Sequence, residues 1–187
     1  MHPARQTAQQ RRSQAGFTLV ELMVIVIIVS ILALLGTYSV RKYVTASKTS
    51  EATEMIATIK AAQESYKDET FNYLNVTTNL DTYYPNNPNA GRVKVQWGGA
   101  DASLANWQAL GVHAALPVLF QYSCVAGPSG AVAVPGGAAS DITVGNWPAT
   151  VNSPWYVVKA EADFEGNGVH TVFVGASFFG ELFSAGN

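Results

Sequence analysis

The sequence predicts an α+β fold in which one long N-terminal α-helix packs on an antiparallel sheet of about four strands. No proline interrupts the chain between Pro3 and Pro85, and apolar residues recur at helical spacing over much of that span. Later segments alternate apolar and polar residues, as half-buried strands do. A helix followed by a run of strands, without regular alternation of the two, is typical of an α+β domain.

The first element is an apolar run from Phe17 to about Val40. A helix of about 20 mainly apolar residues crosses a bilayer core, and this run has that length. Glu21 lies inside it, and a charged side chain in a membrane segment costs about 2.5 to 3.5 kcal/mol on insertion scales. We therefore interpret Glu21 as a functional residue. Its nearest possible partner is an amine created by cleavage of the chain after Gly16.

A short basic segment, residues 1–16, precedes the apolar run. It contains Arg5, Arg11 and Arg12 and no acidic residue. Basic flanks stay on the cytoplasmic side of a membrane, so the domain that follows the run is expected to be exported. No small-residue cleavage site of the secretory kind follows the run, so the helix is expected to stay attached to that domain.

The N-terminal region resembles that of type IV prepilins. The residues that carry the resemblance are the basic leader ending in Gly16, the motif Phe17-Thr18-Leu19-Val20-Glu21-Leu22 and the apolar helix. The resemblance covers about residues 1–70. It implies that a prepilin peptidase cleaves after Gly16 and methylates Phe17 as the new N-terminus. It further implies that Glu21 pairs with the terminal amine of a neighbouring subunit in a helical filament.

The resemblance divides the chain into three parts: a cleaved cytoplasmic leader (1–16), a transmembrane and filament-core half of the helix (17–40), and an amphipathic helix half with a β-sheet domain (41–187). Many pilins carry a proline in the first helix half, about where Tyr38 stands, and this chain does not. Gly36 is the candidate weak point instead, because glycine costs about 1 kcal/mol relative to alanine in a helix. Close helix packing explains the same glycine equally well.

Beyond the apolar run, the helix is expected to continue to about Lys67 as an amphipathic helix. The stripe expected to lie across the sheet consists of Ala52, Met55, Ile56, Ile59, Ala62, Gln63 and Tyr66. Residues 68–88 are rich in Asn, Thr, Tyr and Asp and predict a long surface connection.

Four later segments have strand-like patterns. Residues 92–97 alternate cleanly, which predicts a half-buried strand with Val93, Val95 and Trp97 directed inward. The other expected strands are 118–125, 155–162 and 169–175, with 179–183 pairing or packing beside them. A short helix is expected over 104–110, and the stretch 126–152, rich in Gly, Pro and Ala, is interpreted as an insertion-like loop.

Composition excludes several function classes. Loss of the leader leaves 8 basic and 13 acidic residues, a formal charge of -5, so no nucleic-acid partner is expected. Cys124 is the only cysteine, so no internal disulfide can form; a buried structural thiol is expected. Many type IV pilins close their C-terminal region with a disulfide, and this chain departs from that pattern.

No pattern typical of an enzyme is present, and neither activity nor a cofactor is expected. His113 and His170 lack acidic or cysteine neighbours at metal-ligand spacing. Asp163, Glu165 and Asn167 resemble half of a calcium loop, but a hairpin turn explains the same residues and is favoured.

Most aromatic residues are expected in the core or between subunits. They include four tryptophans, Trp97, Trp107, Trp147 and Trp155. Because they lie beside Pro and Asn, Trp147 and the pair Tyr83-Tyr84 are the candidates for exposed contact residues.

The resemblance implies a structural subunit of a type IV pilus, polymerised for motility, adhesion or DNA uptake. Its expected partners are copies of itself, the prepilin peptidase, the pilus assembly platform and the inner membrane. It is expected in the inner membrane with a cytoplasmic N-terminus, and then in an extracellular pilus. The alternatives are a minor pilin, a type II secretion pseudopilin and, outside the family, a membrane-anchored periplasmic binding domain.

Overall fold

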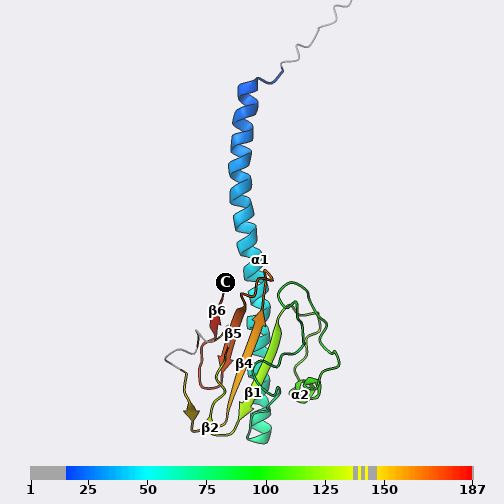
Figure 1. Ribbon diagram of the computed structural model, residues 1–187, viewed down its shortest axis with the longest axis vertical. Helices are drawn as coiled ribbons and strands as arrows, with labels where there is room; N and C mark the ends of the chain where they lie inside the picture. The colour runs from blue at the N-terminus through cyan, green and yellow to red at the C-terminus, as the bar shows by residue number, and fades with distance from the viewer. Residues whose placement is uncertain (1–15, 137–138, 140–141, 143–146, 187) are drawn as a thin grey trace, which may run out of the picture. The chain divides into compact units, whose positions relative to one another are not determined.

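The computed structural model describes residues 16–136, 139, 142 and 147–186 (Figure 1). The predicted leader, apart from Gly16, therefore lies outside the described residues. The chain divides into two compact units, Met1–Val44 and Thr45–Asn187.

The predicted long helix is confirmed. Helix α1 runs without interruption over Leu19–Thr70 and contributes residues to both units. It ends where Phe71 adopts a left-handed backbone conformation with φ of 64°. The Phe71 amide donates a 2.7 Å hydrogen bond to the Lys67 carbonyl and closes the last turn.

The predicted apolar stripe of α1 is confirmed in the second unit. Ala52, Ile56, Ile59 and Gln63 are each at most 1% exposed. The other members of the stripe are half-buried. Burial of this one helical face fixes how α1 lies against the sheet within this unit.

The sheet is antiparallel and has four strands, as the sequence predicts, and their order is β1-β4-β5-β6 (Figure 1). Its strands are β1 Gln121–Gly127, β4 Trp155–Ala162, β5 Thr171–Ala176 and β6 Phe183–Ala185. The register pairs Cys124 with Val158 between β1 and β4, and Lys159 with Val174 between β4 and β5.

Strand β4 is buried along its whole length because both faces of the sheet are covered. Val158 and Ala160 join the core beneath α1. Val157 lies on the opposite face, in a second apolar cluster that includes Leu80 from the connection after α1. That connection therefore covers part of the outer face of the sheet.

The predicted strand over 92–97 is wrong. Only an isolated bridge between Val95 and Val118 forms there, and Val93 is 53% exposed. Backbone groups around Val93 bond locally instead: its amide donates to the Asn89 carbonyl at 3.1 Å and its carbonyl accepts from Asn87 Nδ2 at 2.8 Å. These local hydrogen bonds replace the ladder that the alternation predicted.

The remaining elements follow the prediction with shifted boundaries. Helix α2, Leu104–Ala109, buries Trp107 fully. The strand expected over 118–125 begins at Gln121, and the last expected segment forms a strand at Phe183 instead of Phe179. Within the insertion-like stretch 126–152, part of which lies outside the described residues, β2 (Gly130–Ala131) pairs with β3 (Thr150–Val151).

The prediction that most tryptophans lie in the core is confirmed. The aromatic residues that were expected to be exposed, Trp147 and the pair Tyr83-Tyr84, are instead buried or half-buried. Tyr84 is 1% exposed and packs edge-on against Trp97. Trp147 is half-buried, donates from Nε1 to the Ala133 carbonyl at 3.1 Å and stacks edge-on against Phe178. A neighbouring Pro in the sequence therefore did not identify an exposed aromatic residue at Tyr84 or Trp147.

Candidate functional site

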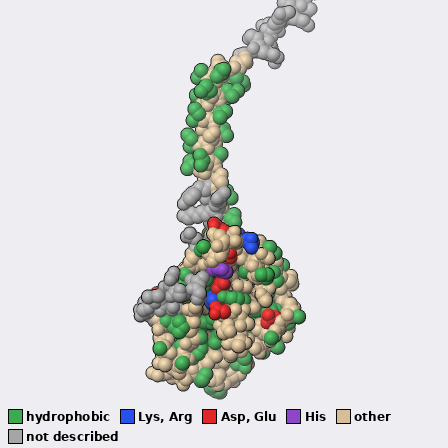
Figure 2. Space-filling model, in the orientation of Figure 1, with side chains coloured by type: hydrophobic (Ala, Val, Ile, Leu, Met, Phe, Trp, Pro, Cys, Tyr) green, Lys and Arg blue, Asp and Glu red, His purple; other side chains and the backbone are tan. Residues whose placement is uncertain are grey.

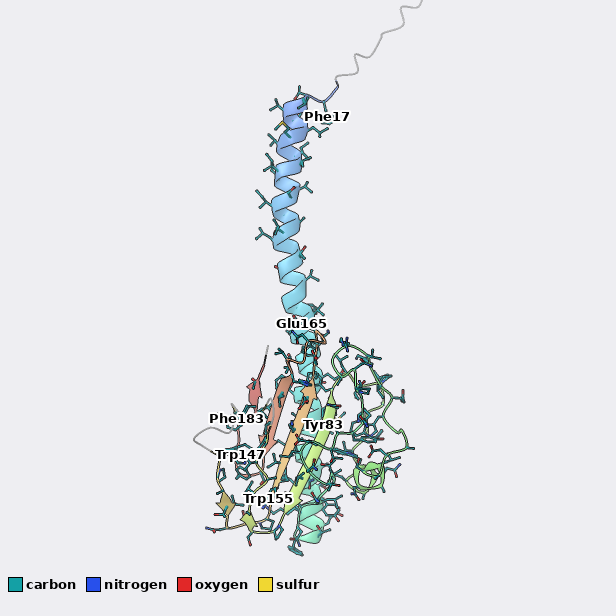
Figure 3. The ribbon with its side chains drawn as sticks, viewed as in Figure 1. Phe17, Tyr83, Trp147, Trp155, Glu165 and Phe183 are labelled. Atoms are coloured by element: carbon teal, nitrogen blue, oxygen red, sulfur yellow. The ribbon has the colours of Figure 1, made fainter. Side chains whose placement is uncertain are left out.

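The N-terminal segment places the predicted cleavage site just outside the helix. Helix α1 begins at Leu19, and the Glu21 amide donates to Thr18 Oγ1 at 3.2 Å. Thr18 therefore caps the helix, which the spacing Thr18-x-x-Glu21 could have signalled. Phe17 is 80% exposed at this end of α1 (Figure 3), and no atom lies within 4 Å of a side chain built at Gly16. The Gly16–Phe17 bond thus lies outside the helix, beside an exposed Phe17.

The following span is an exposed apolar surface. Residues Leu19–Thr37 have a mean hydropathy of 2.9, and none of this span is buried. Hydrophobic side chains cover the visible face of this part of α1 (Figure 2). Nineteen helical residues extend about 28 Å, close to the roughly 30 Å of a bilayer core. So large a patch must be covered by lipid or by other chains.

Glu21 is the one charged residue in this span. The other two polar side chains bond back to the helix: Ser30 Oγ donates to the Val26 carbonyl at 2.7 Å, and Thr37 Oγ1 to the Ala33 carbonyl at 2.8 Å. Among the described residues, no side chain forms an ion pair with Glu21. Its carboxylate is favourably placed in the first helical turn, but outside water it requires a positive partner.

Gly36 lies within the unbroken part of α1, and no atom lies within 4 Å of a side chain built there. The surface at Gly36 is therefore open to a second helix. Whether the helix weakens at this position on assembly remains a prediction.

In the globular unit, four residues form a polar cluster, here called the ionic clasp: Asp81, Tyr83, Lys159 and Glu161. The Lys159 side chain is 1% exposed, and its Nζ lies 3.0 Å from Asp81 Oδ1 and 3.0 Å from Glu161 Oε2. Tyr83 Oη donates to the same Glu161 oxygen at 2.5 Å. Figure 3 shows Tyr83 in front of the sheet, and burial together with Glu161 raises the pKa of Tyr83.

The ionic clasp joins the connection after α1 to the outer face of the sheet. The sequence analysis did not predict this cluster. The available signal was Lys159 and Glu161 inside an otherwise apolar strand. His170 lies at the edge of the ionic clasp, where its Nδ1 is 2.8 Å from Glu161 Oε1. His113 is exposed elsewhere. Over the described residues, no group of three or more His, Cys, Asp and Glu side chains is arranged to hold a metal ion.

The candidate cation residues lie together on the turn between β4 and β5. Asp163 accepts hydrogen bonds from the amides of Glu165 at 3.1 Å, Gly166 at 2.6 Å and Gly168 at 2.9 Å. These bonds stabilise the charged carboxylate and lower the pKa of Asp163. Asn167 Nδ2 donates to Glu165. Both Asp163 oxygens thus brace the turn, which the sequence analysis interpreted as a hairpin in preference to a cation site.

Cys124 is fully buried, as the sequence predicts. Its Sγ accepts a 3.2 Å hydrogen bond from Gln63 Nε2, and burial raises the pKa of the thiol to about 12. A buried neutral thiol of this kind is structural and unreactive.

Comparison with known proteins agrees with this geometry. Residues 11–37 match the family described as the prokaryotic N-terminal methylation motif. The chain is 33% identical over 150 residues to the type II secretion system core protein G of Pseudomonas aeruginosa, and the match covers 74% of this chain and 98% of that protein. No solved structure matches the chain.

Proposed function

The chain belongs to the prepilin-like family that includes type II secretion system core protein G, and from this premise we propose that it is a filament subunit without enzymatic activity. In this proposal a prepilin peptidase cleaves after Gly16 and methylates Phe17. Copies of the chain then leave the inner membrane and polymerise through their N-terminal helices.

The observation that carries this proposal is the exposed apolar span of α1 with a single charged residue, Glu21, near its start. Lipid covers such a span before assembly, and the helices of other copies cover it afterwards. Cleavage creates an amine at Phe17, four residues from Glu21. An ammonium within about 4 to 6 Å favours a charged carboxylate, so the amine of one copy and Glu21 of the next set the register of the filament.

Two kinds of filament compete. The likeness to core protein G covers nearly the whole of that relative, and it favours a secretion pseudopilus, which the sequence left as an alternative. A surface pilus is the second candidate, because about a quarter of this chain lies outside the match. The long connection 71–103, which contains no helix or named strand, also favours variable surface features.

The proposal also specifies where the chain is found. Before assembly it spans the inner membrane with its N-terminus in the cytoplasm, where an assembly platform receives it. Afterwards a pseudopilus subunit stays in the cell envelope, whereas a pilus subunit reaches the cell surface.

Intact mass spectrometry of the native protein, taken from sheared surface material and from membranes, tests the proposal. We expect a mass that starts at Phe17 and carries one added methyl group. Abundance in the sheared fraction indicates a surface pilus, and restriction to the envelope indicates a pseudopilus. The Gly16→Leu variant is the matched control, because it keeps its leader and migrates as a longer chain. A full-length native mass found only in membranes would overturn the proposal and favour a membrane-anchored binding domain.

A further inference from the structure

The exposed turn between β4 and β5 contains the pair Asn167-Gly168, the only Asn-Gly sequence in the chain. The backbone nitrogen that follows an asparagine can attack the side-chain carbonyl carbon, and asparagine is one of the thermolabile residues. A following glycine favours the attack, because it has no side chain to obstruct the nitrogen and adopts many backbone conformations. The sequence alone therefore predicts Asn167 as the most readily deamidated asparagine of the chain.

Deamidation at this pair exchanges one bond for another. The Gly168 nitrogen forms a bond to Asn167 Cγ, the bond between Cγ and Nδ2 breaks, and ammonia leaves with the proton that the nitrogen gives up. The succinimide ring then adds water at either of its carbonyls and opens to aspartate or isoaspartate. The reaction therefore requires that the Gly168 amide lose its proton and that the Asn167 carboxamide release Nδ2.

The structure holds the first of these groups, the backbone amide of Gly168. This amide donates a 2.9 Å hydrogen bond to Asp163 Oδ2. Loss of the amide proton would place a second negative charge beside the carboxylate, and a like charge disfavours the charged form. Asp163 cannot remove the proton itself, because a carboxylate with an ordinary pKa of about 3.9 is far too weak a base. The hydrogen bond therefore makes the nitrogen a poorer nucleophile.

The second group, the side chain of Asn167, is held at both ends. Its Nδ2 donates to Glu165 Oε2 at 3.0 Å, and its Oδ1 accepts from the Val169 amide at 2.8 Å. Since Nδ2 is the leaving group, the hydrogen bond to Glu165 has to break during the reaction. Rotation of the carboxamide towards the Gly168 nitrogen would disturb both bonds.

The turn is also fixed to the rest of the globular unit. The Asp163 amide donates to the Ala90 carbonyl at 2.8 Å. A side chain built at Gly166 would lie 2.5 Å from the guanidinium group of Arg92, so this group lies directly against the turn. Figure 3 shows Glu165 on the same turn. The turn therefore cannot open without losing its contacts with the connection after α1.

We propose that Asn167-Gly168 is a deamidation site that the folded turn protects, and that the Asp163 carboxylate is the group that protects it. The consequence of losing this protection is structural. Ala162 of β4 pairs with Thr171 of β5 where the two strands meet the turn, and isoaspartate inserts an additional main-chain carbon between them. Nothing in this chemistry depends on whether the chain forms a filament.

Incubation of the full chain in detergent at mildly alkaline pH, followed by proteolysis and peptide mass spectrometry, tests the proposal. We expect Asn167 to be converted to aspartate and isoaspartate at least about tenfold more slowly in the folded protein than in the same chain unfolded in urea. Asp163→Ala is expected to raise the rate in the folded protein by at least about tenfold, since a hydrogen bond to a charged group is lost.

Two controls separate the role of Asp163 from a general effect on the fold. Glu181→Ala removes an exposed carboxylate outside the turn and is expected to leave the rate at Asn167 unchanged. Tryptophan fluorescence shows whether each variant is folded. If Asp163→Ala does not fold, Asp163→Asn replaces it, because it keeps the shape of the side chain, removes the charge and leaves a single accepting oxygen. This variant is also expected to accelerate deamidation.

Hydrogen exchange of the Gly168 amide adds a readout on the wild-type chain, because base-catalysed exchange removes the same proton as deamidation does. NMR of the full chain in detergent is expected to show exchange at least about tenfold slower than at an exposed amide without a hydrogen bond. Asp163→Asn is expected to reduce this protection.

Each part of the proposal has its own contrary result. Equal deamidation rates at Asn167 in the folded and the urea-unfolded wild-type chain would overturn the protected site. A folded Asp163 variant that deamidates no faster than the wild type would overturn the role of the carboxylate. Exchange of the Gly168 amide as fast as at an unbonded amide would do the same.

Discussion

Gln63 of α1 and Cys124 of β1 are joined by a hydrogen bond of 3.2 Å between Nε2 and Sγ, in the buried layer between the helix and the sheet. The same amide reaches the connection after the helix: Nε2 donates to the Leu74 carbonyl at 2.8 Å, and Oε1 accepts from the Leu74 amide at 3.0 Å. One buried side chain therefore links the helix, the sheet and the connection that covers the sheet.

Replacement of Gln63 by leucine is expected to destabilise the globular unit by about 2 to 4 kcal/mol. The variant leaves the Leu74 amide and carbonyl without their partner, and each unpaired buried polar group costs about 1 to 3 kcal/mol. Urea unfolding of the full chain in detergent, followed by tryptophan fluorescence, measures the change. Ser65→Ala is the control on the exposed side of the same helix. Equal unfolding midpoints for the two variants would contradict the assigned role of Gln63.

Removal of the Lys159 ammonium group from the ionic clasp is expected to lower the free energy of unfolding by more than Gln63→Leu does. Lys159→Met leaves Glu161 buried without its positive partner, and breaking a buried ion pair from one side costs about 3 to 5 kcal/mol. The same unfolding measurement applies. The matched control is Lys94→Met, which removes the ion pair between Lys94 and Glu51. The Lys94 side chain is 57% exposed, and such surface ion pairs contribute at most about 1 kcal/mol to stability. Similar losses in the two variants would show that the clasp contributes no more than a surface pair.

The long helix and the main sheet could be predicted because their patterns are both local and continuous. The stripe from Ala52 to Tyr66 repeats at helical spacing, and 155–162 is apolar enough to specify a strand. The segment 92–97 has an equally clean alternation and forms no strand. There the outcome depends on hydrogen bonds between Val93 and the residues Asn87 and Asn89, and the alternation of side chains does not determine where the backbone bonds.

The candidate site was predictable only in part. The Gly16 to Glu21 motif predicts the processing and assembly segment, since each residue type has a chemical reason to be there, and the matched family motif covers these residues. The ionic clasp was not predictable. Lys159 and Glu161 alternate with apolar residues, and the solvent-facing residues of a half-buried strand show the same alternation. Their burial depends on Asp81 and Tyr83, which lie far away in the sequence.

Cys124 is expected to be unreactive in the folded protein until the pH is strongly alkaline. Its pKa is raised to about 12 from the ordinary value of 9.0. The reactive thiolate is therefore about a thousandfold scarcer at pH 8 than for an exposed cysteine, and burial slows access further. Alkylation rates of the full chain between pH 7 and 10, with and without urea, measure this. Rapid labelling of folded protein at pH 8 would contradict the buried position of the thiol.

Loss of the Glu21 carboxylate is expected to block assembly while processing and membrane insertion continue. Glu21→Ala leaves the amine of Phe17 in a neighbouring copy buried and unpaired, at a cost of about 3 to 5 kcal/mol. Each 1.4 kcal/mol is tenfold in an equilibrium constant, so filament yield should fall at least about a hundredfold. Quantitative blotting of sheared or envelope filaments against the membrane pool measures the yield.

Two further variants separate the charge of Glu21 from its place in the first turn of α1. Glu21→Gln keeps the shape of the side chain and removes the charge, so it should assemble as poorly as Glu21→Ala. Thr18→Val removes the 3.2 Å hydrogen bond to the Glu21 amide and keeps the charge. Because an N-cap contributes only about 1 kcal/mol, this variant should still form filaments. Equal loss of filaments in Thr18→Val and Glu21→Gln would contradict the ion pair between copies. It would show that assembly requires the capped start of the helix instead.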